Sequence, residues 1–469
     1  MIRLFRVFVP TSVVALLLSE IILTFTCYVV AAFMVLDVDP QVFLLYDNGD
    51  NGWAGWARIA VVVACIMLGV YFHDLYTQFR IKSRILLFQQ IGVVVGLAFL
   101  MQSLLFYLRL REMILPAWLM IYGSALTIVF LPTWRIFYSI VVLRATGSER
   151  VLLLGASPLV QEIAQQFFEH PETGFTVLGY VENLETGEEL PGGAVLGHIS
   201  ELRQIVTKLR PERIVVGMSE RRDRLPVNDL LEMRLSGIHI EDALTTYEAT
   251  FGRISTRELR PSQLVFSTEL GPNQARVMLQ SIYSLGIAIV GTVILSPVML
   301  LVFLLVRLSS RGPGLYRQRR VGKNDVPFTL YKFRSMFTDA EAESGAVWAQ
   351  KDDPRVTWVG KWLRRLRLDE LPQLFNVLKG EMSIVGPRPE RPEFVTELEK
   401  KIPYYRQRHC IKPGITGWAQ INHKYSDTLE DTIIKLEYDL YYIKNLAPAL
   451  DAFIIFHTVK VMLLSRGSQ

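Results

Sequence analysis

The sequence predicts a membrane protein built of three parts: an α-helical N-terminal bundle, a Rossmann-like α/β module, and a C-terminal domain that carries a re-entrant membrane helix. Four long apolar runs precede residue 148, which indicates the bundle. Residues 148–250 contain buried strands and an amphipathic helix, and residues 282–306 form a further apolar run that is interrupted near its middle. The chain has 469 residues, 51% hydrophobic and 20% charged, which suits membrane helices joined to water-soluble domains.

The four apolar runs predict a four-helix transmembrane domain over residues 1–147. They lie at about 12–36, 57–73, 85–108 and 114–143, and each is near the ~20 residues that a helix needs to cross the hydrocarbon layer. Arg3 and Arg6 precede the first run, whereas the connection 37–52 has aspartates and no basic residue. This distribution predicts a cytoplasmic N-terminus. The two arginines of the third connection, RLREM, depart from the pattern because they would face outward.

The first residues and the cysteines indicate the compartment. The start MIRLFRVFVP leads into an apolar run without a small-residue cleavage site, so it is interpreted as a retained anchor rather than a signal peptide. Cys27 and Cys65 lie in apolar runs and Cys410 stands alone, so no spacing indicates a disulfide framework or a zinc site. We therefore expect the polar parts to lie in a reducing, cytoplasmic setting.

Residues 148–250 predict a doubly wound parallel sheet. The segment VLLLGASPLVQEIAQQFFEH is typical of a buried strand, a turn and an amphipathic helix, and PERIVVGM gives a second buried strand. A helix N-terminus after a strand attracts phosphate, so a dinucleotide site is one interpretation. The turn GASPLV lacks the second and third glycines of such a site, which favours a structural, regulatory or assembly module without a dinucleotide.

The apolar run 282–306 predicts a re-entrant helix after a linker at 251–275. Ser296 and Pro297 interrupt the run, and proline removes a helix hydrogen bond, so a kink is expected there. Arg276 precedes the run and several arginines follow it, so both ends prefer the cytoplasmic face. A helix-break-helix that enters one leaflet satisfies both constraints, with a kinked full crossing as the alternative.

Basic segments on either side of an acidic pair indicate an anionic partner. RGPGLYRQRRVGKNDVPFTLYKFRSM ends in a predicted strand with Lys332 and Arg334, and KWLRRLR at 361–367 alternates tryptophan and leucine with cations. Contact with anionic lipid headgroups alone could account for this charge. It does not account for Asp369 and Glu370, because acids near an anionic surface weaken the attachment that the arginines provide.

The pair Asp369 and Glu370 has a chemical interpretation if the cations bind phosphates. A carboxylate is a competent nucleophile toward phosphorus, and Mg²⁺ commonly combines one or two carboxylates with substrate phosphates. Adjacent positions on a helix point about 100° apart, so one acid could attack while the other holds metal or moves a proton. The alternative is an acid pair that stabilises the N-terminus of a helix.

The segments after the acidic pair contain a bracketed arginine and a glycine-rich turn. Arg388 lies between Pro387 and Pro389, which suits either a stiff platform for phosphate or a simple rigid turn. In KPGITGWAQIN, Trp418 could stack on a base or lie at the lipid boundary. The histidines in this half of the chain show no metal-ligand spacing.

Together these motifs resemble a known family. QRRVG, YKFRSM, DPRVTWVGKWLRRLRLDELPQLFNVLKGEMSIVGPRPE and KPGITGWAQIN are similar to the bacterial sugar transferases that act on polyprenyl phosphate, the monotopic phosphoglycosyl transferases. The resemblance covers residues 276–469 and implies an α-rich catalytic domain. The four spans and the sheet module resemble the large-chain branch of this superfamily, hexose-1-phosphate transferases that initiate exopolysaccharide, capsule or O-antigen synthesis.

The resemblance implies a reaction and its partners. A sugar 1-phosphate moves from a UDP-sugar to undecaprenyl phosphate with release of UMP, by a magnesium-dependent, two-step route through a covalent phosphosugar enzyme. The implied location is the bacterial inner membrane, with the catalytic domain on the cytoplasmic face and in contact with membrane lipids. No nucleic acid and no redox cofactor are expected. Homodimer formation and regulation are the candidate roles of the sheet module.

The resemblance also assigns residues. Asp369 matches the family nucleophile and is the expected metal ligand, and Glu370 matches its neighbour, which assists proton transfer or the metal site. Ser296 and Pro297 match the helix break of the family's re-entrant anchor. Lys332 is the expected catalytic cation. The expected substrate-binding residues are Arg320, Arg334, Arg364, Pro387, Arg388 and Pro389.

Two other functions stay open at this point. A membrane-tethered nucleotide-sugar dehydratase or epimerase needs an intact glycine fingerprint and a Tyr-x-x-x-Lys pair, and residues 151–250 contain neither. A noncatalytic scaffold of polysaccharide assembly would use the basic segments only to hold lipid. The sequence does not disclose the sugar, because a few pocket contacts read hydroxyl stereochemistry.

Overall fold

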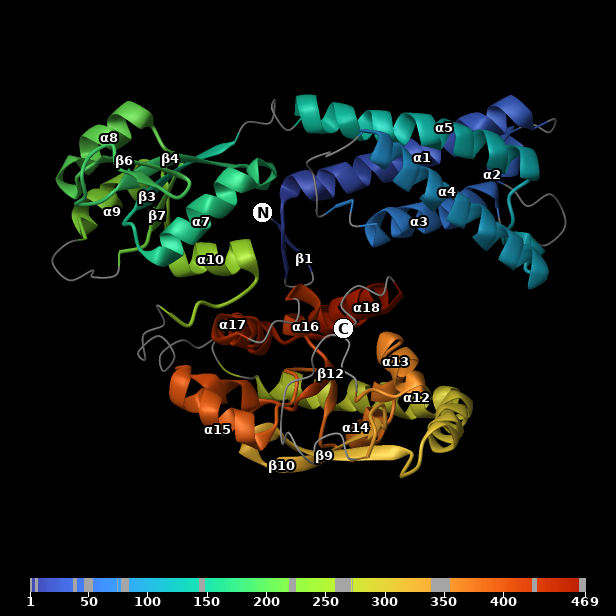
Figure 1. Ribbon diagram of the computed structural model, residues 1–469. Helices are drawn as coiled ribbons and strands as arrows, with labels where there is room; N and C mark the ends of the chain where they lie inside the picture. The colour runs from blue at the N-terminus through green and yellow to red at the C-terminus, as the bar shows by residue number, and fades with distance from the viewer. Residues whose placement is uncertain are drawn as a thin grey trace.

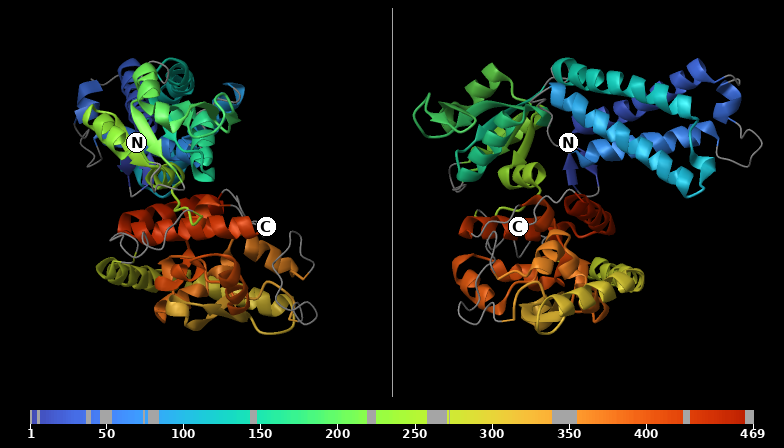
Figure 2. Two further views of the ribbon diagram at one scale, coloured as in Figure 1. Left: turned by 90° about the vertical axis from the view of Figure 1, so that its left-hand side faces the viewer. Right: turned by 45° about the vertical axis from the view of Figure 1, so that its right-hand side comes forward.

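The chain folds into three bodies: a bundle of long helices, a sheet covered by helices, and a C-terminal domain that lies beside both (Figure 1). The computed structural model describes residues 2–4, 7–36, 40–45, 54–73, 75–76, 84–142, 148–218, 225–257, 271, 273–338, 355–423 and 428–463. The two further views in Figure 2 show the same three bodies.

Four long apolar helices form the N-terminal bundle at the predicted positions. They are α1 (Thr11–Val35), α3 (Gly55–Phe72), α4 (Arg84–Tyr107) and α5 (Ala117–Phe137), accompanied by the short α2 (Pro40–Leu45) and the turns η1 (Arg111–Met113) and η2 (Tyr138–Val142). By length and composition each of the four could cross a membrane, and so could α12 (Gln274–Ser309) of the C-terminal domain. The chain is therefore a membrane protein.

A buried ion pair joins α1 to α5 inside this bundle. Arg135 donates Nε and one terminal nitrogen to the two carboxylate oxygens of Glu20, at 2.7 and 2.8 Å, and a second nitrogen to the carbonyl of Leu75. The hydroxyl of Tyr76 also donates to Glu20, at 2.6 Å. A charged pair among apolar helices must be satisfied in this way, because desolvation of a lone charge is costly. The sequence analysis did not single out either residue.

A short antiparallel hairpin precedes α1. Its strands are β1 (Ile2–Leu4) and β2 (Val7–Val9), where the sequence analysis expected only the lead-in to an anchor. β2 contacts α10 (Ala243–Phe251) of the sheet module. The N-terminal end of α1 therefore lies on the side of the bundle that faces the sheet module, as Figure 1 shows.

The sheet module contains six strands in the order β5-β6-β4-β3-β7-β8, of which only β5 is antiparallel to its neighbour. The elements are β3 (Glu149–Leu154), α7 (Pro158–Glu169), β4 (Phe175–Val181), β5 (Glu189–Leu190), β6 (Gly193–Gly197), α8 (Leu202–Leu209), β7 (Arg213–Val216), α9 (Val227–Leu235), β8 (His239–Asp242) and α10. Val151 and Leu153 pack toward α7 and α10, whereas Leu152 and Leu154 pack toward α8 and α9. Alternation along β3 thus buries both faces of the sheet.

The turn between β3 and α7 packs against backbone and side-chain groups of the protein, which take the place that a nucleotide would need. Gly155 has φ +104°, and an added Cβ would lie 2.8 Å from the backbone of Gly217, so the turn requires glycine. The N–H of Ala156 donates to a carboxylate oxygen of Glu182 at 3.2 Å. An acid therefore occupies a backbone donor that a pyrophosphate would use in a dinucleotide site.

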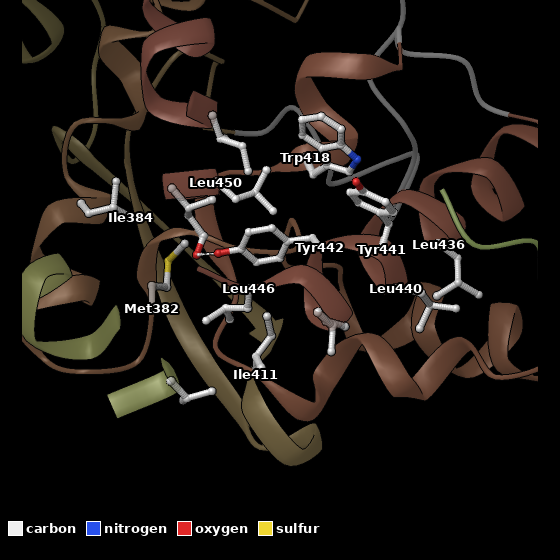
Figure 3. Close-up of a cluster of buried hydrophobic side chains, with 14 of the residues drawn as sticks. Met382, Ile384, Ile411, Trp418, Leu436, Leu440, Tyr441, Tyr442, Leu446 and Leu450 are labelled. Carbon is white, nitrogen blue, oxygen red and sulfur yellow. Dashed lines mark hydrogen bonds between the residues drawn. The ribbon is translucent and has the colours of Figure 1, made fainter. Parts of the chain in front are cut away.

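The C-terminal domain packs helices around a small hairpin and a two-stranded parallel sheet. Its elements are α12, β9 (Leu315–Val321), β10 (Pro327–Phe333), α13 (Trp358–Arg365), η6 (Leu368–Glu370), α14 (Gln373–Leu378), β11 (Ser383–Val385), α15 (Pro392–Lys401), η7 (Tyr405–Cys410), β12 (Gly414–Thr416), α16 (Trp418–Asn422), α17 (Leu429–Asn445) and α18 (Pro448–Leu463). Aromatic side chains of α17 fill the centre of its core (Figure 3).

Trp418 belongs to this core, so the expectation of a base-stacking or lipid-boundary role was wrong. Its ring stacks on Tyr441 with centroids 5.7 Å apart, and the two lie side by side in Figure 3. Its indole N–H donates to the carbonyl of Gly252 at 2.7 Å, just beyond α10. The residue therefore ties the C-terminal domain to the end of the sheet module.

Both ends of α12 are attached to the same domain. In its first half, Gln280 donates to the carbonyl of Val385 at 3.1 Å and to Asp451 at 2.8 Å. In its second half, the carbonyl of Val306 accepts from Arg334 at 3.3 Å. Pro297 lies inside the helix, and the ribbon changes direction along α12 (Figure 1).

The C-terminal domain also contacts the bundle at the C-terminal end of α3. Lys460 of α18 donates to the carbonyl of Tyr71 at 2.7 Å, and the hydroxyl of Tyr71 lies 3.0 Å from Nδ1 of His457. A cation at the last turn of a helix is favourable because the helix dipole is negative there. The C-terminal end of α3 and the N-terminal end of α1 therefore face the same side.

Candidate active site

The acidic pair lies in a single 3₁₀ turn, η6, that follows α13. Thr357 begins α13, because its hydroxyl accepts the N–H of Gly360 at 3.0 Å. Arg367, with φ +52°, lies between α13 and η6 and immediately precedes η6. Leu368 and Leu371 on either side pack against the second half of α12. As a result Asp369 and Glu370 are about nine-tenths buried, with 8% and 9% of their surface exposed.

Glu370 is held by two cations. Its Oε1 accepts from Nζ of Lys332 at 3.0 Å and from a guanidinium nitrogen of Arg388 at 3.5 Å. Burial opposes its ionisation, but the charges of Lys332 and Arg388 outweigh burial and lower the pKa of Glu370. Glu370 is therefore a fixed anion that orients both cations.

Asp369 differs from its neighbour in its partners. In the described part of the chain its carboxylate makes no hydrogen bond or ion pair, although Lys332, Arg364 and Arg388 act on it electrostatically. Burial raises the pKa of Asp369 above its usual value, and the three cations oppose that shift only in part. The carboxylate is thus basic, unengaged and surrounded by positive charge, as a nucleophile toward a phosphate requires.

A buried asparagine connects the strand that carries Lys332 to the helix that follows the acidic pair. Asn376 of α14 is fully buried, accepts the N–H of Tyr331 at 3.1 Å and donates to the carbonyl of Thr329 at 2.7 Å. This clamp fixes β10 beside η6, which brings Lys332 to Glu370. Sequence reasoning missed Asn376, and its one signal is a polar residue inside the apolar run LPQLFNVL.

The loop with Arg388 rests on a close approach of two backbones. β11 and β12 pair in parallel, and the N–H of Gly414 donates to the carbonyl of Pro387 at 2.9 Å. An added Cβ at Gly414 would lie 2.1 Å from the nitrogen of Gly386, and one at Gly417 would lie 2.2 Å from its carbonyl oxygen. The glycines of KPGITGW therefore let this turn support the bracketed arginine.

Arg320 supports the same loop from the opposite side. One of its terminal nitrogens donates to the carbonyl of Pro389 at 3.0 Å and lies 3.5 Å from Glu390, and its other nitrogens donate to Gln318. Burial and the neighbouring Arg388 lower the pKa of Arg320, while Glu390 opposes the shift. Arg320 and Arg388 thus form a cationic cluster next to the acidic pair.

The structure separates Arg334 from this cluster. Its guanidinium is buried and donates to the carbonyls of Val306, Ser310 and Arg311 at the C-terminal end of α12, at 2.7–3.3 Å. Arg364 instead stays near the acids, because its Nε donates to the hydroxyl of Ser335 at 3.0 Å and its charge acts on Asp369. Arg364 therefore lies near the acidic pair, whereas Arg334 secures the C-terminal end of α12.

Ser296 and Pro297 lie within α12, away from these contacts. The hydroxyl of Ser296 donates back to the carbonyl of Val293 at 2.8 Å, a bond that bends helices. Several large apolar side chains around the break are exposed, among them Val293, Ile294 and Leu300. The break is thus surrounded by a surface suited to lipid.

Asp369 suits Mg²⁺ as a ligand that the metal would share with substrate phosphates. The described residues contain no group of three or more His, Cys, Asp or Glu side chains that could hold a metal alone. Magnesium does not need one, because it binds through one or two carboxylates together with substrate phosphates. The unengaged oxygens of Asp369 fit this arrangement.

Comparison with known proteins identifies the C-terminal domain. The family described as bacterial sugar transferase matches residues 275–465. A UDP-glucose:undecaprenyl-phosphate glucose-1-phosphate transferase from Escherichia coli (strain K12) is 35% identical over 328 residues, 68% of each chain, and a protein of the same description from Klebsiella pneumoniae is 35% identical over 321 residues, 67% of each.

A UDP-N-acetylgalactosamine-undecaprenyl-phosphate N-acetylgalactosaminephosphotransferase from Aeromonas hydrophila is 44% identical over 222 residues. This match covers 47% of the present chain and about half, 52%, of the Aeromonas protein. The motifs that meet at Asp369, Glu370, Lys332 and Arg388 all lie within the matched residues. The chain therefore belongs to the bacterial sugar transferase family.

Proposed function

We propose that this protein transfers a sugar 1-phosphate from a UDP-sugar to undecaprenyl phosphate, releases UMP, and thereby initiates the synthesis of an exopolysaccharide, capsule or O-antigen. One observation carries the proposal: Asp369 has an unengaged carboxylate, while the adjacent Glu370 is locked to Lys332 and Arg388. A site built for two anionic substrates needs both a free nucleophile and fixed cations.

The reaction proceeds in two displacements at phosphorus. In the first, an oxygen of Asp369 attacks the phosphorus that carries the sugar, the bond from that phosphorus to the bridging oxygen breaks, and UMP leaves with that oxygen. In the second, a phosphate oxygen of undecaprenyl phosphate attacks the same phosphorus. This step frees the carboxylate and gives a lipid diphosphate sugar, and any proton on the acceptor passes to the acidic pair.

The cations supply the stabilisation that each displacement needs. Lys332 and Arg388, oriented by Glu370, would stabilise the negative charge that develops on the transferred phosphate and on the leaving UMP. Arg364 of α13 acts on Asp369 through its charge, and Arg320 holds the loop of Arg388 through the carbonyl of Pro389. Mg²⁺ held by Asp369 and the donor phosphates would neutralise further charge.

We also propose that α12 enters the membrane and returns on the same side. Two observations support re-entry: both halves of α12 hydrogen-bond to one domain, and a straight helix of 36 residues would be about 54 Å long, far more than a single crossing needs. Exposed Trp358 and Trp362 on α13 would mark the membrane boundary. The acids would then lie at the cytoplasmic face of the inner membrane, where lipid acceptor and soluble donor meet.

The relatives support these substrates by their descriptions, which name undecaprenyl phosphate with UDP-glucose or with UDP-N-acetylgalactosamine. The sugar of the present protein stays open between such donors. A nucleotide-sugar dehydratase is not favoured, because Glu182 occupies the N–H of Ala156 in the only described turn that resembles a dinucleotide site.

The proposal is tested by supplying membranes that contain the protein with UDP-sugars labelled at the sugar phosphate, with Mg²⁺ and without lipid acceptor. The parent should retain label on the protein and release UMP once per site, whereas Asp369→Asn should do neither. Glu397→Gln, the same kind of change on an exposed acid of α15, serves as the control and should behave as the parent. Removal of Mg²⁺ by a chelator should stop the release of UMP without unfolding the protein.

A different outcome would separate the alternatives. If Asp369→Asn releases UMP as the parent does, the covalent route is wrong. If neither releases UMP from any UDP-sugar while polysaccharide assembly in cells continues with the variant, the protein is a scaffold.

A further inference from the structure

The active-site arginine Arg388 is held through its backbone by a second arginine that lies deeper in the domain. Arg408, in η7, donates a terminal nitrogen to the carbonyl of Arg388 at 3.0 Å. Its other terminal nitrogen donates to the hydroxyl of Tyr405 at 2.8 Å. Only 6% of Arg408 is exposed, so solvent does not compensate its charge.

The positive charge of Arg408 is balanced by a buried acid, Asp439. Asp439 of α17 is 1% exposed, and one of its carboxylate oxygens lies 2.7 Å from the nitrogen of Arg408 that also binds the Arg388 carbonyl. Burial raises the pKa of Asp439 to about 6, while Arg408 acts in the opposite direction. An ion pair this deep is a costly way to stabilise a core, because apolar residues of the same volume would do as well or better.

The connection extends from α17 to the catalytic carboxylates in three contacts. Asp439 binds Arg408, Arg408 binds the carbonyl of Arg388, and the side chain of Arg388 reaches Glu370 at 3.5 Å. The flanking prolines leave the Arg388 backbone few conformations, so a bond to its carbonyl helps to fix the direction of its Cα–Cβ bond, and the contact with Glu370 orients the guanidinium.

We infer that Arg408 and Asp439 are positioning residues, which hold Arg388 against Glu370 so that its guanidinium meets the phosphate in the transition state. The inference deepens the proposed function and rests on it for the identity of the phosphate. Neither residue touches substrate: Arg408 acts through the Arg388 carbonyl, and Asp439 acts through Arg408.

The opposite face of α17 offers a matched control. Glu437 is two positions before Asp439, so their side chains point about 160° apart around the helix. Glu437 is 3% exposed and accepts the N–H of Thr256 at 3.0 Å and the hydroxyl of Tyr247 at 3.2 Å, both beyond the active site. A change at Glu437 therefore disturbs a buried acid of the same helix without touching the Arg388 loop.

The first test is a double-mutant cycle on kcat and KM for UMP release by the full chain. Arg408→Lys keeps the charge but loses the planar set of donors, so it should lower kcat about 10- to 100-fold and change KM for the UDP-sugar less than about 3-fold. In an Arg388→Ala background, Arg408→Lys should lower kcat by less than a further factor of about 3, because the side chain that Arg408 positions is already absent. Asp439→Asn should follow the same pattern with a smaller loss.

Glu437→Gln is the control in both backgrounds and should stay within about 3-fold of its parent. Equal, additive losses from Arg408→Lys with and without Arg388 would overturn the inference, because they would assign Arg408 to general stability. Losses from Glu437→Gln as large as those from Asp439→Asn would overturn it for the same reason.

The second test does not depend on catalysis. Hydrogen exchange at the amides of Gly386 and Arg388, measured by mass spectrometry on the whole protein, should rise at least about 10-fold in Arg408→Lys and not in Glu437→Gln. Unchanged exchange in Arg408→Lys would overturn the positioning role. If the parent released no UMP from any UDP-sugar, the proposed function would fail, and the exchange result would still decide whether Arg408 holds the loop.

Discussion

Nζ of Lys332 lies 3.0 Å from Oε1 of Glu370, although 38 residues separate them in the chain. The contact depends on Asn376, which accepts the N–H of Tyr331 and donates to the carbonyl of Thr329, both in β10. It leaves the neighbouring Asp369 without a bonded partner in the described residues, at the centre of a cationic cluster. This division of roles between two adjacent acids is the basis of the predictions that follow.

Removal of the Lys332 charge should disable the site. In Lys332→Met, Glu370 loses its nearer cation, and the developing charge on phosphate loses a fixed partner, so UMP release should fall at least about 100-fold. The free energy of unfolding should fall by about 1–3 kcal/mol, because a buried carboxylate loses a hydrogen bond. Lys379→Met, on an exposed lysine bonded to Tyr331, is the control and should lose little. Similar rates for the two variants would contradict the assignment.

The protein-labelling step should have an acid limb above the usual pKa of aspartate. Burial raises the pKa of Asp369 from 3.8, so its attacking, ionised form becomes populated only at higher pH. For stability the sign is opposite: the folded state holds this proton more tightly, so the contribution of Asp369 to the unfolding free energy declines as pH rises from 3.8 through the folded pKa. Single-turnover labelling against pH measures the limb.

The pH profile of labelling in Lys332→Gln tests whether the titration of Asp369 causes the acid limb. Lys332 is the cation that most opposes the shift, so its removal should move the limb to higher pH. A limb that stays in place, or moves to lower pH, would show that Asp369 is not the titrating group.

Gly414→Ala should damage the support of Arg388. The new Cβ would lie 2.1 Å from the nitrogen of Gly386, and backbone cannot move as a side-chain end can, so we expect a loss of about 1–3 kcal/mol of stability and most of the activity. Gly286→Ala is the matched control, because its Cβ would meet nothing within 4 Å. Thermal unfolding in detergent and UMP release measure the two effects. Equal behaviour of the two alanine variants would refute the close-approach argument.

Replacing the helix break should change the topology of α12. Ser296→Leu combined with Pro297→Leu removes the back-bonding hydroxyl and restores the missing helix N–H, so a straight crossing of the membrane becomes competitive. A tag after residue 469, detected from either side of sealed vesicles, should be reached from the cytoplasmic side in the parent and from both sides in the double variant. A parent tag reached only from outside would exclude re-entry.

Several features of the fold could be predicted from the sequence because they depend on local pattern. The four bundle helices lie within a few residues of the predicted runs, and the strand-turn-helix predicted at 151–170 is formed by β3 and α7. Apolar length and alternation specify such elements without reference to the rest of the chain. The buried pair of Glu20 and Arg135 was not predicted, because each residue looks like an isolated charge until α1 packs on α5.

For the site, the sequence by itself determined the chemical groups: an acid pair, the cations around it and the prolines that bracket Arg388. Only the tertiary structure decided which acid is engaged, that Arg334 is bonded to the end of α12, that Trp418 lies in the core, and that Arg408 and Asp439 stand behind Arg388. The physical reason is that charge and burial at one atom are sums over neighbours distant in the chain. A linear pattern names the groups, and the distances between them exist only once β10, η6, β11 and α17 have packed together.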